Sequence, residues 1–392
     1  MRTMRILKHL FSNDICSIHR SRLKAVFFGV GALLTGGRLS LTALGRGARG
    51  KTAPKHSIKR VDRLLGNRHL HSDIGHLCHA MVAWLLGSER RPVILVDWTL
   101  VGDNHNALVA AIPRDGRALP IYFEVHDRKL LGNRQVEHRF LERLRDVLPK
   151  DCRPTVVTDA GFRNPWLAKI QAMGWDYVAR LTTWVLIRDG ATGDWLKTSV
   201  IEAMAGRSPR DLGCCQVSRR SMLEHRVVVG KRFERNPTRS LQPRRDSHHS
   251  RGNKQIRRRS KTPWLLATSR YDLSPKQLEQ IYATRMQIEE VFRDTKNHRF
   301  GWSFSHARSR SAQRYTVLFL LAALAGLVLT FVGLAAERAQ LHHRYQANTI
   351  RNRRVLSLFH LGKTILARAR PSEIAQLNLF SAAKGIDLYE IA

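Results

Sequence analysis

Residues 282–296 read YATRMQIEEVFRDTK, a segment that contains no glycine or proline and many residues that favour helices. The segment therefore predicts one continuous helix. Helical spacing would place four polar side chains on one face of it: Tyr282, Arg285, Glu289 and Lys296. An apolar stripe beside them can anchor the helix in a core. A phenol, a carboxylate and two cations on one face indicate a site that meets a polyanion or a metal ion. A solvent-exposed face with an i,i+4 Arg–Glu pair is the alternative interpretation.

The charge of the chain indicates its kind of partner. Among 392 residues, 67 are Lys or Arg and 31 are Asp or Glu, which gives a formal net charge of +36. Such an excess is typical of proteins that bind nucleic acid, because Lys and Arg contacts with phosphates release condensed counterions. An anionic membrane surface is the second candidate. The five cysteines include no Cys-x-x-Cys pair, which favours the reducing cytoplasm over a disulfide framework.

One apolar segment is long enough to cross a bilayer. Residues 317–336 form a run of 20 residues interrupted only by glycine and threonine. The alternative is a fully buried helix of a large globular protein. We favour the buried helix, because the run is solitary and basic stretches flank it on both sides. No membrane partner is therefore expected.

The rest of the sequence predicts a mixed α/β protein with helical flanks. Residues 1–85 have a helical texture, including a basic helix that ends at Gly66, and we expect this region to contact DNA. A plain helical cap on the next domain is the alternative. Strands are predicted at 91–99, 106–113, 118–125, 154–162 and 176–181, and helices at 133–148 and 164–173. A three-stranded meander followed by alternating helix and strand indicates a mixed sheet.

Residues 184–262 differ in texture from the segments around them. Short strand candidates alternate with turns, and a very basic stretch follows that includes Arg257, Arg258 and Arg259. We interpret this stretch as a phosphate-binding arm within a β-rich insertion, with a solvated loop as the alternative. A strand is then predicted over 262–269. A helix should begin at Pro275 after an N-cap at Ser274.

Three acidic residues are distinguished by their positions. Asp97 ends the first buried strand, Asp159 ends a later one, and Glu289 lies on the helix described first. If they converge, their mutual repulsion calls for a divalent cation. Since no His or Cys set accompanies them, Mg²⁺ or Mn²⁺ fits better than zinc, and two such ions suit phosphodiester chemistry. As alternatives, Asp97 could cap a turn, Asp159 could be a turn aspartate, and Glu289 could form a surface ion pair.

The spacing Y-x2-R-x3-E-x6-K, formed by Tyr282, Arg285, Glu289 and Lys296, resembles a known signature. It is similar to the Tyr-Arg-Glu-Lys motif of cut-and-paste DDE transposases of bacterial insertion sequences, in the insertion-sequence-four family. Glu290 adjoins Glu289, but only Glu289 shares the face of the other three residues.

Other segments extend the resemblance over nearly the whole chain. ILVDWT around Asp97 and VTDAGF around Asp159 resemble the first two acidic motifs of that family. KRVDRLLGNRHL, YATRMQIEEVFRD and QANTIRNRRVLS are similar to the branch carried by the tetracycline-resistance composite transposon.

The resemblance implies an α/β fold with a ribonuclease-H-like catalytic core, a β-rich insertion, an N-terminal helical DNA-binding domain and a C-terminal helical region. The expected domains are 1–88 (DNA binding), 89–183 (first part of the core), 184–262 (insertion), 263–312 (second part of the core, with the Glu289 helix) and 313–392 (C-terminal helices).

The resemblance also implies an enzyme. Asp97, Asp159 and Glu289 would be the catalytic residues and would bind two Mg²⁺ ions, with Mn²⁺ as a substitute. Similar enzymes nick one strand, form and reopen a hairpin on the transposon end, and join the 3′-ends to target DNA. The expected partners are double-stranded DNA, both transposon ends and target, and a second copy of the chain in a homodimer. No small-molecule substrate is expected.

Further residues are expected to contact DNA. Tyr282, Arg285 and Lys296 would hold phosphates near the cleaved end. Candidates for stacking on a flipped base, or for other DNA contacts, are Met286, Trp264, Trp184 and Arg293. Two other functions compete with the transposase: a ribonuclease-H-like nuclease or resolvase without strand transfer, and a non-catalytic basic DNA-binding protein.

Overall fold

The computed structural model describes residues 4, 7–8, 11, 18–48, 50, 52–114, 116–182, 184–190, 192–220, 223–231, 263–299, 301–309, 311–346, 350 and 352–379. Within it the chain forms two compact units. The first unit joins Met1–Pro154 to Thr284–Glu390, and the second contains Thr155–Ala283. The five expected domains stay predictions.

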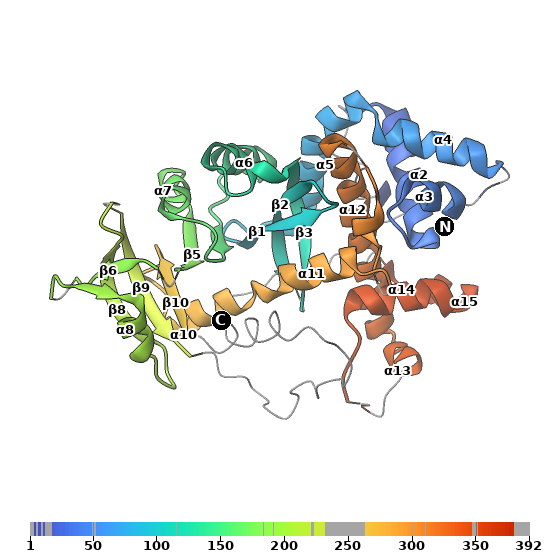
Figure 1. Cartoon of the computed structure of the whole chain (residues 1–392). Helices are drawn as coiled ribbons and strands as arrows, with labels where there is room; N and C mark the ends of the chain where they lie inside the picture. Colours follow the sequence, from blue (N-terminus) through green and yellow to red (C-terminus); the bar gives the residue numbers. More distant parts are fainter. Residues whose placement is uncertain are drawn as a thin grey trace, which may run out of the picture. The chain divides into compact units, whose positions relative to one another are not determined.

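The first unit begins with four described helices: α2 (Arg20–Gly36), α3 (Leu41–Gly47), α4 (Pro54–Leu65) and α5 (Arg68–Leu86) (Figure 1). The predicted helical texture of this region is confirmed where the structure describes it. Gly37 ends α2 with a left-handed backbone (φ 66°), and the Ser40 hydroxyl then caps α3 by accepting the amide of Ala43 at 3.3 Å. Helix α4 ends at Gly66, as the sequence predicts.

Three antiparallel strands follow, β1 (Val93–Val101), β2 (His105–Arg114) and β3 (Arg117–Asp127), in the order β3-β2-β1. This meander confirms the predicted strands, but Asp97 does not end its strand as predicted: it lies in the middle of β1 and pairs with Val109 on β2. The alternation of β1 sends neighbouring side chains to opposite faces. Trp98 donates its indole N–H to Glu137 on α6 (Arg134–Val147) at 3.1 Å. Asp97 and Thr99 point to the other face, where α11 (Met286–Lys296) packs.

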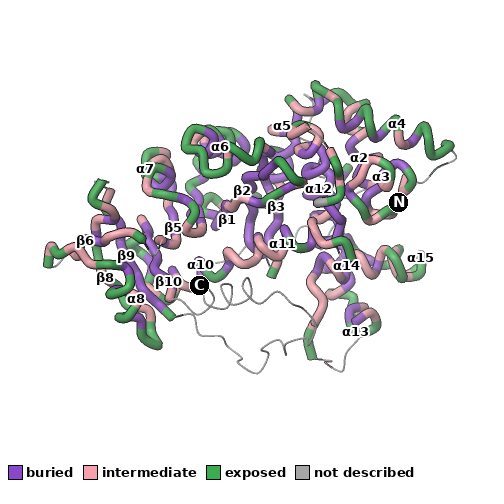
Figure 2. Tube along the Cα trace, in the orientation of Figure 1, coloured by how far each residue is buried: buried purple, intermediate pink, exposed green. Residues whose placement is uncertain are grey.

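The long helix α12 (Ala312–Arg338) lies in the core of the first unit. It packs against β3, α2, α4, α5 and α14 (Leu358–Arg368). Its length and composition would allow it to cross a membrane, but its most apolar part is almost wholly buried inside the protein, and Figure 2 shows this burial along α12. The finding agrees with the predicted core helix. The smaller elements of the unit are η1 (Arg128–Leu130), η3 (Phe304–His306), α13 (His342–Tyr345) and α15 (Pro371–Gln376).

Helices α12 and α14 approach each other so closely that glycine is required at their crossing. A Cβ atom added at Gly362 would overlap the carbonyl oxygen of Leu329, and one added at Gly333 would overlap that of Leu358. The two backbones are therefore in direct contact.

Gly362→Ala is expected to lower the free energy of unfolding by about 3 kcal/mol, because the two backbones must separate to admit a methyl group. Urea denaturation measures the change. Gly31→Ala is the matched control: no described atom lies within 4 Å of the added Cβ, and alanine in helix α2 should stabilise by up to about 1 kcal/mol. Equal stability of the two variants would contradict the close crossing.

The second unit is built on strands in the order β4-β5-β10-β9-β8-β6-β7. Their bounds are β4 Thr155–Thr158, β5 Asp176–Arg180, β6 Leu186–Arg188, β7 Trp195–Lys197, β8 Arg210–Val217, β9 Glu224–Gly230 and β10 Trp264–Thr268. Strands β4 and β5 are parallel and are joined through α7 (Asn164–Ala172), as expected of a βαβ unit. Strand β10 pairs with both β5 and β9, so the strands of the predicted insertion continue this sheet. Strand β7 and helix α8 (Thr198–Ala203) were not predicted.

The single helix predicted over residues 282–296 is wrong. Helix α10 (Pro275–Ala283) ends before a turn, and α11 begins at Met286. In the turn, hydrogen bonds run from Gln287 N to Thr284 O (2.9 Å) and from Ile288 N to Arg285 O (3.2 Å), which is a tighter i→i+3 pattern than an α-helix has. The boundary between the two compact units falls between Ala283 and Thr284.

The predicted start of α10 is confirmed. Ser274 accepts the amide of Gln277 at 3.3 Å, and the Gln277 side chain accepts the amide of Ser274 at 2.9 Å. This reciprocal pair is a capping box, and Pro275 follows at the first helical position.

Candidate active site

Two of the predicted carboxylates meet at one guanidinium. Arg285 donates from Nη1 to Asp97 Oδ2 at 3.2 Å, and its Nη2 forms an ion pair with Glu289. The side chains of Arg285 and Asp97 are each 13% exposed, and that of Glu289 is 39% exposed. Since 188 positions separate Arg285 from Asp97, the fold itself creates this cluster.

Lys296 lies on the same face of α11. Its Nζ donates to Thr99 Oγ1 at 2.6 Å, and Thr99 is two residues beyond Asp97 on β1. Burial lowers the pKa of Lys296, and the negative charge of Asp97 partly opposes the shift. Arg285, Glu289 and Lys296 therefore share one face, as predicted, and Arg285 and Lys296 contact β1 from it. Thr99 was missed, although strand alternation placed it beside Asp97.

Asp159 follows directly after strand β4 in the second unit, one residue beyond the strand that the sequence predicts it to end. Its Oδ1 accepts the amide of Gly161 at 2.8 Å, which closes a turn just after the strand. Nearby, Arg270 fixes the start of β4 by donating to Thr155 Oγ1 at 2.8 Å. The role of Asp159 as a third metal ligand stays a prediction.

The oxygen donors fit a hard divalent cation better than zinc. Asp97 and Glu289 offer carboxylate oxygens only, and a cationic side chain already lies against both of them. Within the residues that the structure describes, no three His, Cys, Asp or Glu side chains gather at one point as a metal site. Asp97 and Glu289 thus bring together two of the three carboxylates that are predicted to bind metal.

Tyr282 departs from the expected arrangement. It lies on α10 rather than α11, is only 3% exposed, and packs edge-on against Trp264 with ring centroids 4.8 Å apart. Trp264 is buried as well. Trp184 is 93% exposed, which is unusual for so large an apolar side chain. The DNA contacts predicted for these three residues stay predictions.

The remaining candidates differ in their surroundings. Met286 begins α11 and is half-buried, whereas Arg293 is exposed and paired with Glu290. Glu290 also pairs with Arg117, away from Asp97, which supports Glu289 as the acidic residue of the site. The last three candidates lie outside the described residues: Arg257, Arg258 and Arg259.

This mixed α/β fold, with acidic and basic side chains gathered between a strand and a helix, is consistent with ribonuclease-H-like enzymes that act on nucleic acid. The chain matches the family model of the transposase DDE domain over residues 88–325, more than half of its length, and it belongs to that family. No curated protein matches the chain. The family implies DNA as the partner and a DDE-type transposase nuclease as the class of enzyme, and such enzymes generally use divalent metal ions.

Proposed function

We propose that this protein is a transposase that binds the terminal inverted repeats of its own transposon. It catalyses metal-dependent cleavage, end hairpin formation and resolution, and transfer of the 3′-OH ends into target DNA. The observation that carries the proposal is the cluster of Asp97, Arg285 and Glu289 inside the matched transposase domain. The spacing of the signature residues supports the finer assignment to the insertion-sequence-four family.

The acidic residues are proposed as the metal ligands. When bound by Asp97, Asp159 and Glu289, two Mg²⁺ ions, or Mn²⁺ in their place, supply activation of the attacking hydroxyl and stabilisation of the leaving oxygen. In the first unit, the carboxylates of Asp97 and Glu289 both contact the guanidinium of Arg285, which supports this assignment.

Basic and aromatic residues are proposed to hold the DNA. Arg285 presents a planar fork of N–H donors that suits bidentate contact with phosphate oxygens, and Lys296 adds a partly dehydrated point charge. For stacking on a flipped base we favour Trp184, because its side chain is exposed whereas that of Trp264 is buried.

Strand transfer tests the proposed function. The purified chain is mixed with labelled duplexes that carry the inverted repeats flanking its gene, together with a target plasmid, with Mg²⁺ or with EDTA. We expect nicked, hairpin and joined products only with Mg²⁺, in complexes that hold two protein copies. Cleavage without joining would favour a nuclease or resolvase, and binding without cleavage a non-catalytic DNA-binding protein.

Helix α4 is proposed as a DNA-contacting element of the N-terminal region. It buries Val61, Leu64 and Leu65 and exposes a basic face that includes Lys55, Lys59 and Arg63. A helix with one apolar face and one basic face can pack on the core and contact phosphates at the same time.

Replacing Lys55, Lys59 and Arg63 together with alanine is expected to weaken end binding by at least about tenfold. The slope of log K against log salt concentration should become shallower by about 2 to 3, since each lost phosphate contact removes close to one released counterion. Fluorescence anisotropy at several salt concentrations measures both effects. Asp62→Asn, an exposed position on the same helix, is the control and should not weaken binding. An unchanged salt slope in the triple variant would contradict the assignment.

A further inference from the structure

Helix α11 has a second polar face, opposite the one that meets Asp97. Gln287, Glu290 and Asp294 follow one another at spacings of three and four residues, so they share a face. At 3.6 residues per turn, this face is turned by roughly 150° from the face of Glu289 and Lys296. An apolar stripe that includes Ile288 and Phe292 lies between the two faces on the buried side.

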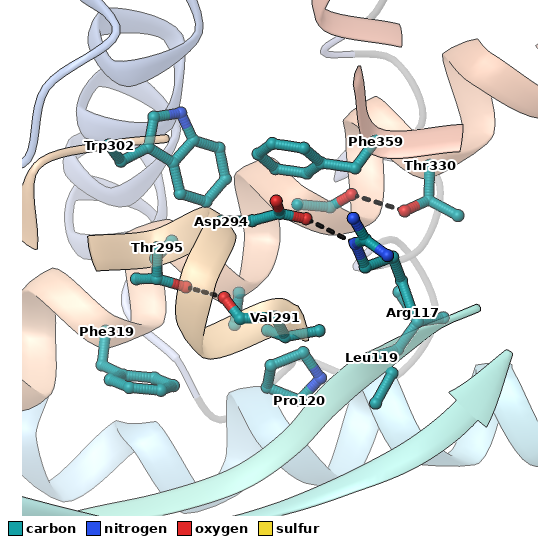
Figure 3. Close-up of a pocket in the computed structure, with 14 residues that line it drawn as sticks. Arg117, Leu119, Pro120, Val291, Asp294, Thr295, Trp302, Phe319, Thr330 and Phe359 are labelled. Atoms are coloured by element: carbon teal, nitrogen blue, oxygen red, sulfur yellow. Dashed lines mark hydrogen bonds and ion pairs between the residues drawn. The ribbon is translucent and has the colours of Figure 1, made fainter. Parts of the chain in front are cut away.

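All three residues of this second face contact the strand ends on either side of the β2–β3 turn, Arg114 on β2 and Arg117 on β3. The amide of Arg114 donates to Gln287 Oε1 at 2.6 Å. Arg117 donates from Nε to Asp294 Oδ2 at 2.7 Å, and its Nη2 lies 3.3 Å from Glu290 Oε2. Figure 3 shows Arg117 reaching from β3 to Asp294 on α11. We call Arg117, Glu290 and Asp294 the Arg117 clamp.

Asp294 is the most enclosed member of the clamp. Its side chain is 9% exposed, and its Oδ1 lies 3.1 Å from His360 Nε2 on α14. Its backbone carbonyl accepts the amide of Trp302 at 3.1 Å. Burial alone would raise the pKa of Asp294, but the hydrogen bonds from His360 and Arg117 outweigh it and hold the pKa below its usual value. Asp294 is therefore the ionised and nearly enclosed member of the clamp, whereas Arg117 and Glu290 are each about a quarter exposed.

The two kinds of contact on α11 have different effects on its position. Apolar packing of Ile288 and Phe292 holds the helix on the sheet, but such packing has little directional preference. Hydrogen bonds to the clamp are directional and resist rotation of the helix about its axis. If the helix rotated by about 10°, a side-chain tip that lies 5–6 Å from the helix axis would be displaced by about 1 Å. A misplacement of about 1 Å can cost an enzyme about 10²-fold in rate.

We infer that Arg117 and Asp294 are positioning residues, which fix the rotation of α11 and so place Glu289 and Arg285 beside Asp97. The inference rests on the proposed function of that site. The clamp and the Asp97 cluster lie on opposite faces of α11, so the effect of Arg117 and Asp294 passes through the backbone of the helix.

Single-turnover cleavage of preformed protein–DNA complexes tests the inference. Asp294→Asn and Arg117→Gln should each lower the cleavage rate constant by about 10- to 100-fold, with the Kd for the DNA end unchanged within about twofold. The double variant should be no slower than the slower single variant, because both changes break the same clamp. Arg117→Lys should recover part of the rate.

Glu337→Gln provides the matched control. It breaks another carboxylate–arginine pair of the first unit, Glu337 with Arg354 at 2.9 Å, away from α11. It should leave the rate constant unchanged. A merely structural role of the clamp would lower the fraction of active protein, and thus the amplitude, without changing the rate constant. Wild-type rate constants in Asp294→Asn and Arg117→Gln would overturn the inference while leaving the proposed function intact.

Hydrogen exchange on the DNA-free chain gives a readout that does not depend on cleavage. Amides of α11 should exchange faster in Asp294→Asn than in the wild type, whereas those of α12 should not change. Unchanged exchange in α11 would overturn the inference even if the wild-type chain showed no cleavage, an outcome that would separately contradict the proposed function.

Discussion

Replacing Glu289 with glutamine is expected to reduce cleavage of transposon ends by about 10³-fold or more, with end binding retained. The amide keeps the shape of the side chain but removes the negative charge that a hard divalent cation requires of its ligand. Asp97→Asn and Asp159→Asn should have effects of the same size, because all three carboxylates are proposed to serve one site. Single-turnover cleavage and anisotropy binding measurements with the same labelled ends separate chemistry from affinity.

Glu290→Gln is the matched control for Glu289. It is the next residue of α11, but its carboxylate pairs with Arg117 and Arg293 on another side of the helix. Because Arg117 keeps its contact with Asp294, we expect Glu290→Gln to slow cleavage by less than about tenfold. Normal cleavage by Glu289→Gln would refute the assignment. Normal cleavage by Asp159→Asn alone would remove only Asp159 from the proposed site.

Local sequence patterns were sufficient to predict the elements that carry the acidic residues. The apolar run before Asp97 gave a buried strand, and the run before Asp159 gave another, because unbroken β-branched and aliphatic residues are typical of sheet interiors. The i,i+4 spacing of Arg285 and Glu289 predicted their shared face. In each case the determining contacts are local, so a short window of sequence contains the information.

The features that were missed depend on contacts between distant segments. Nothing in the composition of residues 282–296 indicates a break, yet Tyr282 packs on Trp264 and Arg285 reaches Asp97. The Arg117 clamp was missed for the same reason, since 177 positions separate Arg117 from Asp294. Tertiary contacts of this kind routinely override local preference. For α12 the sequence left two environments open, because an apolar segment of this length fits either a membrane or a protein core. Burial of α12 by neighbouring helices favours the core.

Arg285→Gln is expected to lower cleavage by about 10²-fold and, at the same time, to strengthen the response of the DNA-free chain to Mg²⁺. Both effects follow from the position of Arg285 between Asp97 and Glu289. Its removal takes away a bidentate donor for phosphate, which slows the reaction. It also leaves two carboxylates whose repulsion a divalent cation can relieve, so that Mg²⁺ should stabilise the variant more than the wild type.

Thermal unfolding with and without Mg²⁺, measured beside single-turnover cleavage, tests the two effects together. Arg285→Lys is the matched variant: it keeps the positive charge but lacks the planar fork that spans both carboxylates. We therefore expect a Mg²⁺ response close to that of the wild type and a cleavage rate between those of the wild type and Arg285→Gln. An equal Mg²⁺ response in all three proteins would contradict the electrostatic coupling of Arg285 to a metal site. A wild-type cleavage rate in Arg285→Gln would contradict its contact with phosphate, because the charge and the donors would then both be dispensable.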